Sequence, residues 1–479
     1  MDKGEITQQL IQLREEMGDF LLNLSEAQHI NMADASKQNL CAFLALQKFK
    51  SPALHSYLVE EGFSSIQMMS PHVLYSLDKI ISHLSLKDRR DENYIDRKNA
   101  IYLKEQRNQE LLGKSEEDSV SIMVTLDKPM LETPEIFKEL LRAGMTIARI
   151  NLARDYSIWK TLVENIRAAE KEMGIERQIR KCKIYMDLPG PKVRVNDFWE
   201  KQVTIKVKKG DMIRIYKTDN YLGGPKSKKG EPASIGVTIP KALRNVRTKD
   251  KVYFDDGKIC GVVVEVNGKY LDVKIILTRN KVEYIKPHKG INLPDSLVCL
   301  NVPAVTDTDM QMLSEVISFV DIVGISFIHS PNDIRIVKGY LEQYTERKIG
   351  IIAKIETKHA LVSLSNIILE GLNLNLFGVM IARGDLAIEI GYKQLVKAQE
   401  EILEMCRAAH VPVIWATGIL NDMNKKGIPL RTELTDAFMG LRADCIMMNK
   451  GPYISKSLEF LQELDQINKG PLLEFRNST

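Results

Sequence analysis

The spacing of apolar residues divides the chain into a helical N-terminal part and a longer part in which strands and helices alternate. Between Ile6 and Leu21, apolar residues recur every three or four positions, which is the spacing of one face of a helix. A similar pattern occupies residues 73–81. The spacing predicts a helical domain over residues 1–118, whose charged end at 87–118 forms a solvated linker or an exposed helix.

From residue 119 onward, eight short apolar and β-branched runs alternate with amphipathic helical patterns. Eight strands that are each followed by a helix are the pattern of a (β/α)8 TIM barrel, so we predict an α/β protein with the barrel at 119–194 and 288–479. One last helix is expected at 454–467. The predicted strands are 121–126, 146–152, 183–188, 321–327, 350–356, 377–382, 411–417 and 443–449.

One connection in this pattern is far longer than the others. About 130 residues separate the third and fourth predicted strands, and much of that stretch alternates between apolar and polar residues. The alternation is broken by the turn sequences KKGD, DDGK and VNGK. We therefore predict a small β-barrel lid domain at residues 195–287, inserted into the larger barrel.

Composition places the chain among globular proteins with large cores. Hydrophobic residues make up 44% and charged residues 27% of the sequence. The net charge of +4 is too small to indicate a nucleic-acid partner. No apolar run approaches the roughly 18–20 residues of a membrane span, and the N-terminus has no apolar signal core. The six scattered cysteines form no CxxC pair. We expect a cytoplasmic protein with reduced, buried cysteines and no membrane or nucleic-acid partner.

Two predicted strands end on charged residues instead of an ordinary turn. In KIE, Lys354 and Glu356 point to the same face, because side chains alternate along a strand. In ARGDL, Gly384 lets the backbone approach another group closely, and Asp385 follows it. A lysine and two carboxylates at the ends of buried strands indicate a Mg²⁺-assisted reaction on an anionic substrate. The alternative is a plain ion pair beside a turn aspartate.

The other strand ends add cations and polar groups to the same mouth of the barrel, where barrel enzymes place their chemistry. These residues are Arg149, Asn151, Asp187, Lys192, Arg194, Arg383, Thr417, Asn449 and Lys450. Phosphoryl transfer needs cations around the phosphoryl oxygens, and Arg149 and Lys354 are placed to supply them. Asn151 and Thr417 have a simpler alternative role, which is to satisfy backbone groups at the strand ends.

Several segments, in the same order along residues 120–450, resemble the pyruvate kinase family. They are GMTIARINLAR, MDLPGPKVR, FDDGK, KGINLPDSLVCLNVPAV, GISFIHSPNDI, IIAKIETKHALV, GVMIARGDLAIEIG, PVIWAT, PLRTELTDA and RADCIMM. The resemblance implies transfer of a phosphoryl group between phosphoenolpyruvate and ADP, which yields pyruvate and ATP.

By the same resemblance, Glu356 and Asp385 would bind Mg²⁺, for which Mn²⁺ could substitute. Lys354 would stabilise the transferring phosphoryl group and the enolate, Arg149 would bind phosphate, and Thr417 would help deliver a proton to the enolate carbon.

Further roles follow for the substrate and the nucleotide. The backbone at Arg383 and Gly384 would hold the substrate carboxylate, beside Asp385. The residues on the nucleotide side would be Asn151, Arg154, Arg194 and Lys289. The inserted domain would close over the nucleotide and exclude water.

The chain departs from the family pattern at the expected K⁺ site. Ala153 stands where many members have serine, Leu188 where they have threonine, and Lys192 where they have glutamate. A lysine ammonium can take the place of a monovalent cation. We therefore predict that Lys192, near Asp187, replaces K⁺ and that added K⁺ is not required.

Other departures leave the physiological substrate open. Arg154 stands where the family often has histidine, the loop after the eighth strand reads MNKGPYI, and the usual C-terminal α/β domain is expected to be absent. Lys450 in this loop contacts substrate or pairs with an acid. One alternative function is a related Mg²⁺-dependent enzyme that acts on another 2-oxo or enol acid. Another is a non-catalytic regulatory or binding protein. We expect a homo-oligomer.

Overall fold

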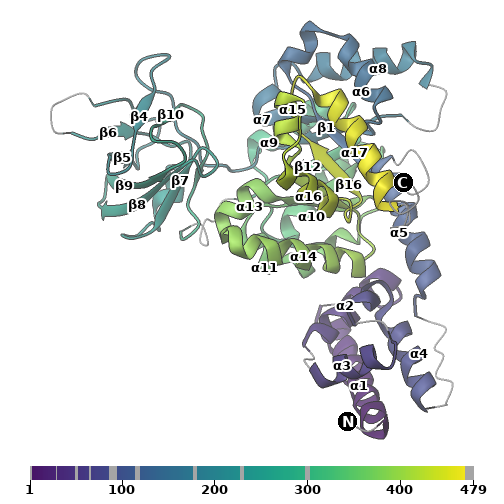
Figure 1. Ribbon diagram of the computed structural model, residues 1–479. Helices are drawn as coiled ribbons and strands as arrows, with labels where there is room; N and C mark the ends of the chain where they lie inside the picture. Colours follow the sequence, from purple (N-terminus) through teal and green to yellow (C-terminus); the bar gives the residue numbers. More distant parts are fainter. Residues whose placement is uncertain are drawn as a thin grey trace, which may run out of the picture.

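The computed structural model describes residues 3–28, 30–48, 52–63, 66–85, 94–113, 119–175, 181–226, 231–296 and 303–469. It has three parts (Figure 1): a barrel surrounded by helices, a β-rich domain beside it and a helical domain below it.

The barrel contains eight parallel strands in a closed ring, which confirms the predicted fold class. Around the ring the order is β1-β16-β15-β14-β13-β12-β3-β2. All eight predicted strands are present, and their ends differ from the expected ones by at most a few residues. They are β1 (Ser121–Thr125), β2 (Ile147–Asn151), β3 (Lys183–Asp187), β12 (Ile322–Ile325), β13 (Gly350–Ile355), β14 (Phe377–Ala382), β15 (Val413–Ile419) and β16 (Cys445–Met448).

The barrel strands are buried along almost their whole length, as expected for a parallel sheet that is covered on both faces. Side chains such as Met123, Tyr185, Ile352 and Met380 fill the interior of the ring. The outer faces pack against a surrounding layer of helices. These helices are α6 (Glu135–Arg142), α7 (Leu152–Asp155), α8 (Trp159–Glu172), α9 (Asp307–Val316), α10 (Pro331–Tyr344), α11 (Lys358–Val362), α12 (Leu364–Gly371), α13 (Arg383–Ile390), α14 (Tyr392–Ala408), α15 (Asn421–Lys426), α16 (Arg431–Gly440) and α17 (Ile454–Lys469).

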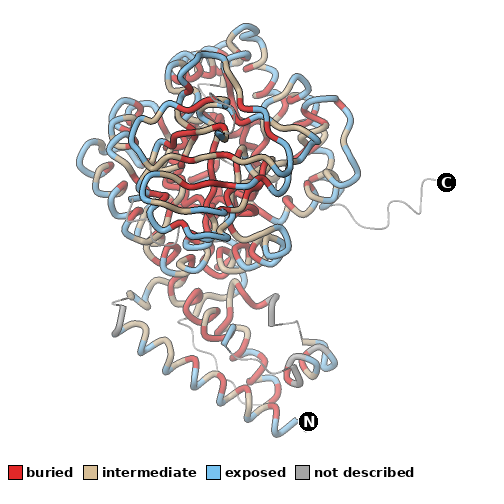
Figure 2. Tube along the Cα trace, turned by 90° about the vertical axis from the view of Figure 1, so that its left-hand side faces the viewer, coloured by how far each residue is buried: buried red, intermediate tan, exposed pale blue. Residues whose placement is uncertain are grey.

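The N-terminal part is helical, as predicted. Its helices are α1 (Lys3–Gln28), α2 (Ala35–Lys48), α3 (Pro52–Glu60), η1 (Ile66–His72), α4 (Val73–Ser85) and α5 (Arg97–Leu112). Figure 2 shows buried positions concentrated in the barrel, with further buried positions inside the helical domain. In the described part of the chain, no helix combines the length and apolar character needed to cross a lipid bilayer.

Helix α5 matches the second of the two alternatives that we considered at 87–118, a solvated linker or an exposed helix, because all but four of its residues are exposed or half-buried. The structure describes residues 94–113 of that stretch. There, the Asp96 side chain caps the first turn by accepting a hydrogen bond from the Asn99 amide, and Gly113 ends the helix at φ +66°. Leu111 and Leu112, in the last turn, are fully buried. The charged sequence did not reveal that one face of this helix packs against the barrel.

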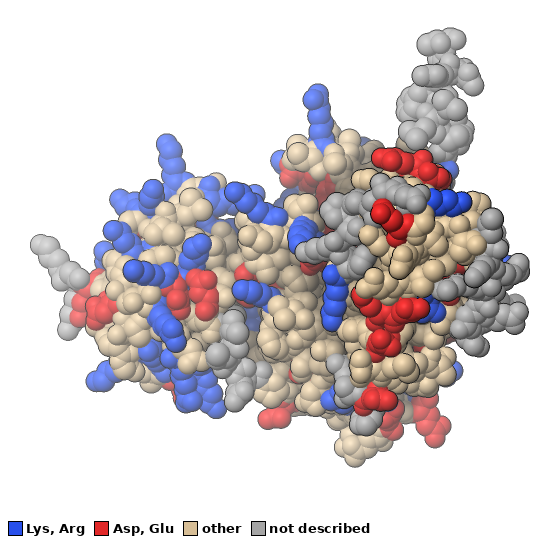
Figure 3. All heavy atoms as spheres, turned by 90° about the horizontal axis from the view of Figure 1, so that it is seen from below, with Lys and Arg blue, Asp and Glu red and all other residues tan. Residues whose placement is uncertain are grey.

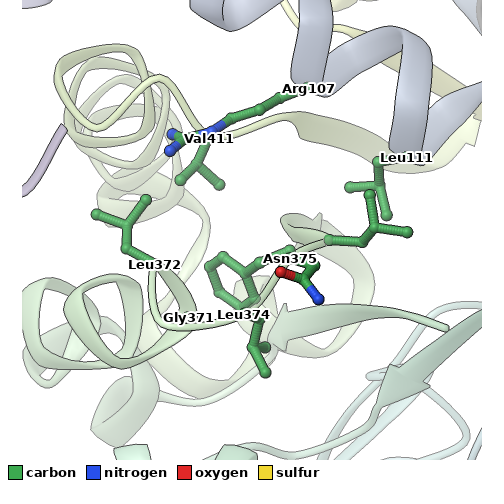
Figure 4. A pocket seen from close by; sticks show the side chains of 9 residues that line it. Arg107, Leu111, Gly371, Leu372, Leu374, Asn375 and Val411 are labelled. Carbon is green, nitrogen blue, oxygen red and sulfur yellow. The ribbon is translucent and has the colours of Figure 1, made fainter. Parts of the chain in front are cut away.

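The last turn of α5 closes the floor of the barrel, at the N-terminal ends of the strands. Leu111 and Leu112 belong to the same apolar cluster as the barrel interior. Gly350 and Gly378, at the starts of β13 and β14, leave room for Leu111, because a Cβ atom added at either glycine would collide with its methyl groups. Figure 4 shows Arg107 and Leu111 extending from α5 towards a cavity of about 20 Å³, which is room for one water molecule.

Hydrogen bonds attach the rest of the helical domain to the floor. The Asn39 amide donates to the carbonyl of Ala408 at 2.8 Å, and Arg107 donates to the carbonyl of Ala409 at 2.9 Å. His410 lies between its ring partners, the Ser36 hydroxyl at 3.0 Å and the Pro71 carbonyl at 2.8 Å. The two domains therefore share a buried polar interface.

The inserted domain has one apolar core surrounded by a curled six-stranded sheet and a two-stranded ladder. The sheet order is β11-β7-β8-β9-β5-β6, and β4 pairs with β10. Beyond these strands, Arg194 bridges to Gly290 beside β11 and Val195 bridges to Val237 beside β6, so residues 194–195 join the two ends of the curled sheet, in line with the small barrel that we expected. Val193, Ile291 and Leu293, just outside the expected range 195–287, also belong to this core. The strands are β4 (Ile205–Val207), β5 (Met212–Tyr216), β6 (Ala233–Ile235), β7 (Lys251–Phe254), β8 (Ile259–Val266), β9 (Tyr270–Thr278), β10 (Glu283–Ile285) and β11 (Ile291–Asn292).

The cysteines agree with the expectation of reduced core residues. Cys41, Cys182, Cys260, Cys406 and Cys445 are free and buried. Cys299 lies outside the described residues.

Candidate active site

Lys354 is the centre of a buried polar cluster at the mouth of the barrel. Its ammonium group donates to the Ser326 hydroxyl at 2.8 Å. It also pairs with Asp187 at 3.2 Å and with Glu356 at 3.1 Å. Three strand ends, those of β3, β12 and β13, therefore fix the position of one positive charge. We did not predict Ser326 as a site residue from the sequence. Its position just after β12, where barrel strands end at the mouth, is the feature that could have identified it.

Arg149 is fixed in the same cluster from the end of β2. Its guanidinium group donates to Asp187 at 2.7 Å and to the Thr125 hydroxyl at 2.8 Å. Tyr185 donates to the other oxygen of Asp187 at 2.7 Å. The Asp187 carboxylate thus holds Arg149 and Lys354 side by side, each with its charge directed into the mouth of the barrel.

The electrostatic balance keeps this cluster ionised. Burial acts to lower the pKa of Lys354, but the carboxylates of Asp187 and Glu356 outweigh burial and raise that pKa above its usual range. Burial acts to raise the pKa of Asp187, but Arg149 and Lys354 outweigh it, so this pKa is lowered. Lys354 therefore stays a cation, and Asp187 an anion, at neutral pH.

Glu356 and Asp385 are two carboxylates that influence each other. Burial raises the pKa of Glu356; Lys354 opposes this rise and the Asp385 carboxylate adds to it. One Glu356 oxygen accepts a hydrogen bond from the Phe327 amide at 2.6 Å. Two acids in a buried site that repel each other are a favourable environment for a cation.

Lys192 lies beside Asp385, whereas we expected it near Asp187. Its ammonium group donates to the two Asp385 oxygens at 2.8 and 3.1 Å, and it lies 3.4 Å from an Asp256 oxygen in the inserted domain. Asp187 needs no further cation, because Arg149 and Lys354 already neutralise it. Asn292, which the sequence did not single out, adds a hydrogen bond to Asp385 at 3.1 Å.

The donor set fits a magnesium ion that is shared with a substrate. In the described part of the chain, no three His, Cys, Asp or Glu side chains form a cluster that could hold a metal. Mg²⁺ is commonly bound by one or two carboxylates, with waters and substrate phosphates completing the shell. Glu356 and Asp385 can supply those two carboxylates, provided that the Lys192 ammonium moves off Asp385.

Arg383, Gly384 and Thr417 form the opposite wall of the site. The Arg383 side chain is tied to the end of β15, because it donates to the carbonyls of Ala416 at 2.9 Å and Thr417 at 2.5 Å. It also pairs with Asp436, a partner that the sequence did not reveal. The side chain is therefore occupied, which leaves the backbone of Arg383. Arg383 is the first residue of α13, and amide groups in the first turn of a helix have no partner within the helix.

Thr417 has an unusual backbone conformation. Its φ of +74° is strained for a β-branched residue, and such strain often accompanies function. Gly384 approaches it so closely that a Cβ atom at position 384 would lie 2.9 Å from the Thr417 methyl carbon. The hydrogen bond from Arg383 holds the Thr417 carbonyl in this strained position.

The residues expected on the nucleotide side are spread over the barrel and the inserted domain. Burial lowers the pKa of Arg194, and the nearby Arg154 cation lowers it further. Lys289 pairs with Asp255 at 2.9 Å. Asn151 caps α7 by accepting from the Ala153 amide at 3.1 Å, which is the simpler role that we considered for it.

Lys450, after β16, pairs with Asp127 at 2.9 Å. This contact matches the alternative in which Lys450 neutralises an acid. Asn449 donates to the Asn421 side chain at 3.3 Å, so the loop after β16 is anchored to α15.

Comparison with known proteins gives a consistent result. Residues 117–455 match the family described as pyruvate kinase, barrel domain. A pyruvate kinase of Thermococcus litoralis is 30% identical over 359 residues, covering 73% of this chain and 69% of that protein. One of Mycobacterium intracellulare is 28% identical over 338 residues, covering 68% of this chain and 65% of that protein. One of Clostridium perfringens is 30% identical over 325 residues, covering 67% and 63%. The chain thus spans 63 to 69% of the length of these curated relatives.

Proposed function

Because the chain belongs to the pyruvate kinase family, we propose that it transfers a phosphoryl group between phosphoenolpyruvate and ADP. In the direction of ATP synthesis, the bond between the enol oxygen and phosphorus breaks, and a bond from phosphorus to the ADP terminal oxygen forms. The remaining enolate takes up one proton at its methylene carbon and becomes pyruvate.

The buried ammonium group of Lys354 is the observation that best supports this function. It is held between Asp187 and Glu356 and stays protonated, since its pKa is raised above the usual lysine range. A fixed positive charge in a buried site stabilises negative charge that develops on the enolate and the phosphoryl oxygens. Arg149 would bind the equatorial phosphoryl oxygens from the adjacent strand.

The other side chains would orient the substrate and deliver the proton. The backbone amides of Arg383 and Gly384, at the start of α13, would bind the substrate carboxylate. The Thr417 hydroxyl would help to deliver a proton to the enolate carbon, through a water molecule. Arg154, Arg194, Lys289 and Asn151 would contact the nucleotide, and the inserted domain would close over it to exclude water.

Glu356 and Asp385 would hold Mg²⁺, or Mn²⁺ in its place. When bound there, the metal would polarise the phosphoryl and carbonyl oxygens as a Lewis acid. Lys192 would provide the charge that K⁺ supplies in many relatives, so that the reaction would not require K⁺. We further propose that the protein works as a homo-oligomer.

The test is a direct assay of the purified protein. Pyruvate and ATP would be measured from phosphoenolpyruvate, ADP and Mg²⁺, with and without K⁺, for the wild type and Lys354→Met. Removal of the fixed charge should lower kcat by about a thousandfold, the size of effect seen for one electrostatic stabiliser. Lys358→Met is the matched control, because Lys358 is exposed at the start of α11.

Other outcomes would favour the alternative functions. If the wild type forms no pyruvate but binds Mg²⁺ and ADP, the enzyme acts on a different 2-oxo or enol acid. The changed loop at Asn449 and Lys450, at the mouth of the barrel, would then be the place to look for the altered specificity. If it binds neither, the chain is a regulatory or binding protein.

A further inference from the structure

The inserted domain carries far more positive charge than the rest of the chain. Residues 195–287 contain 20 Lys and Arg against 11 Asp and Glu, a formal net charge of +9. Because the whole chain has a net charge of +4, the remaining residues together carry −5. The small overall charge therefore conceals a strongly basic domain. In Figure 3, Lys and Arg side chains crowd the visible face of this domain, at the left.

Most of the described cations of this domain form no ion pair, although Lys217 donates a hydrogen bond to the Asn267 carbonyl at 2.8 Å. Among the described residues of 195–287, only Arg214 and Lys258 form an ion pair with a carboxylate. Lys201, Lys206 and Lys269, for example, are exposed and unpaired. A surface of one sign repels itself and disfavours the compact state. Such a charge asymmetry in a soluble fold is typical of a domain that meets a polyanion.

An aromatic cluster lies within this basic surface. The Tyr216 and Tyr221 rings are stacked with their centroids 4.0 Å apart, and Tyr270 meets Tyr216 edge-on at 5.8 Å. The Arg214 guanidinium stacks on the Tyr270 ring at 3.7 Å and is held in plane by the two hydrogen bonds that it donates to Asp272, both 2.8 Å long. All of these rings are partly exposed.

The cluster lies on strands at the side of the domain that is turned away from the barrel. In Figure 1, β5, β6 and β9 lie on that side, whereas β7 lies nearer to the barrel. Tyr270 and Tyr216 are paired in register on β9 and β5. Lys217 and Lys269, joined by a backbone hydrogen bond of 2.9 Å, follow directly beside them. The aromatic and basic groups are thus next to each other and away from the catalytic cluster.

A second pair on the same domain repeats this combination. Lys206 on β4 lies directly opposite Tyr284 on β10, and both side chains are exposed. Cations that alternate with aromatic rings on strands are the features of surfaces that bind single-stranded nucleic acid, where the bases stack on the rings and the cations follow the phosphates.

We propose that the inserted domain binds single-stranded nucleic acid on this outer surface, formed by Tyr216, Tyr221, Tyr270 and Arg214 with Lys217 and Lys269. The exposed Lys226, five residues after Tyr221, adds a further cation. The bases stack on the tyrosine rings and on the Arg214 plane, and the lysines contact the phosphates. A site that only attracted anionic substrates to the barrel would need no exposed aromatic rings beside its cations.

A lipid surface is a poorer partner for this domain. Peripheral membrane binding commonly uses an amphipathic helix with Trp, Phe or Leu on one face. The described residues of 195–287 contain no α-helix, only the 3-10 turn η4 (Pro240–Leu243). In the cluster, Tyr216 and Tyr221 are stacked on each other and Tyr270 meets Tyr216 edge-on, so the three rings do not form an apolar wedge.

The test measures binding of the full chain to a fluorescent oligouridine of about 15 nucleotides, by anisotropy. Binding should weaken at least tenfold between about 50 and about 200 mM salt. Tyr221→Ala and Tyr270→Leu should each weaken it by about tenfold, the size of one lost stacking contact. The triple variant Lys217→Gln, Lys226→Gln, Lys269→Gln should lose most binding, whereas Lys160→Gln, Lys171→Gln, Lys393→Gln on the barrel should not.

The proposal would be overturned if the wild type, shown to be folded by its thermal unfolding transition, did not bind the oligouridine. Wild-type affinity in both tyrosine variants would indicate a general polyanion surface instead, and displacement by saturating ADP would indicate the nucleotide site. Binding only to phosphatidylserine vesicles would indicate a membrane surface. The assay requires no catalytic activity, so its outcome is independent of the proposed kinase reaction. Unchanged thermal unfolding of each variant would show that the fold is intact.

Discussion

Lys192 donates hydrogen bonds to both carboxylate oxygens of Asp385, although one residue belongs to the connection into the inserted domain and the other to the first turn of α13. The same ammonium group lies 3.4 Å from Asp256 on the inserted domain. Burial acts to lower the pKa of Lys192, but Asp385 and Asp256 outweigh it, so the pKa is raised. A proposed metal ligand therefore has a built-in counter-ion that also contacts the inserted domain.

The first prediction concerns this counter-ion. If Lys192 takes the place of K⁺, then Lys192→Met should lower kcat about tenfold without K⁺, equivalent to about 1.4 kcal/mol of transition-state stabilisation. Added KCl should restore much of the loss. The measurement is pyruvate formation over a KCl titration, with Lys201→Met, an exposed lysine of the inserted domain, as the control. A loss that KCl leaves unchanged would show that Lys192 serves only as the partner of Asp385.

The second prediction concerns the contact between Gly384 and Thr417. Gly384→Ala would place a Cβ atom 2.9 Å from the Thr417 methyl carbon, so one of the two backbone segments must move. Displacement of about 1 Å in a catalytic site costs about a hundredfold in rate, and we expect a loss of that order in kcat.

The control is a second substitution that removes the clashing methyl group. Thr417→Ser keeps the hydroxyl and is better tolerated at a φ of +74° than a β-branched residue. Thr417→Ser alone should stay near wild-type activity, and the double variant Gly384→Ala, Thr417→Ser should recover most of the loss. Equal activity of the single and double variants would rule out steric crowding as the cause.

The third prediction is a pH dependence at the interface between the helical domain and the barrel. Burial lowers the pKa of His410 to about 4, from an ordinary value of 6.5. The unfolded chain therefore binds a proton more readily than the folded chain, and His410 should cost stability as the pH falls from 6.5 to 4. The shift corresponds to about 3 kcal/mol of unfolding free energy, lost over that window.

Urea unfolding of the wild type and His410→Asn at several pH values would measure this contribution. Asparagine tolerates the φ of +53° at this position and does not titrate. The variant should be less stable than the wild type at pH 7, and the difference should shrink towards pH 4. A difference that is constant with pH would mean that His410 has the same pKa in the folded and the unfolded chain.

The fourth prediction concerns the floor of the barrel. Leu111→Ala should lower the free energy of unfolding by about 2–5 kcal/mol, because it leaves a cavity against Gly350 and Gly378. Leu22→Ala is a matched control, since Leu22 is 65% exposed on α1 whereas Leu111 is 1% exposed. Thermal or urea unfolding measures both. Equal stability of the two variants would show that α5 contributes little to the barrel.

The sequence predicted the barrel well, because its strands are continuous apolar runs bounded by charged or turn residues. It placed Lys354, Glu356 and Asp385 at strand ends for the same reason, and the structure brings Lys354 and Glu356 into contact. Local pattern could not predict partners that come from distant parts of the chain. Asp436 and Asn292 have no distinctive sequence context, and Lys192 was assigned to Asp187 although its actual partner, Asp385, follows only after β14.

The N-terminal part is a second example of contacts that the local sequence pattern does not predict. The helical spacing was sufficient to predict α1 and α4, but α5 is rich in charge, and its sequence left a linker and an exposed helix as alternatives. Its contacts with loops and strands of the barrel come from a few side chains, among them Lys104, Arg107, Asn108 and Leu111. An amphipathic pattern that is defined by so few contacts is visible only once the barrel is in place.

The floor of the barrel also sets an order of events during synthesis. The helical domain is synthesised before the barrel and can form from contacts closer in sequence, which are the contacts that fold fastest. Leu111 cannot contact Gly350 and Gly378 until β13 and β14 have been made much later in the chain. A nascent chain therefore carries an exposed apolar helix end throughout most of its translation, and the closing of the barrel around that end is what completes the fold.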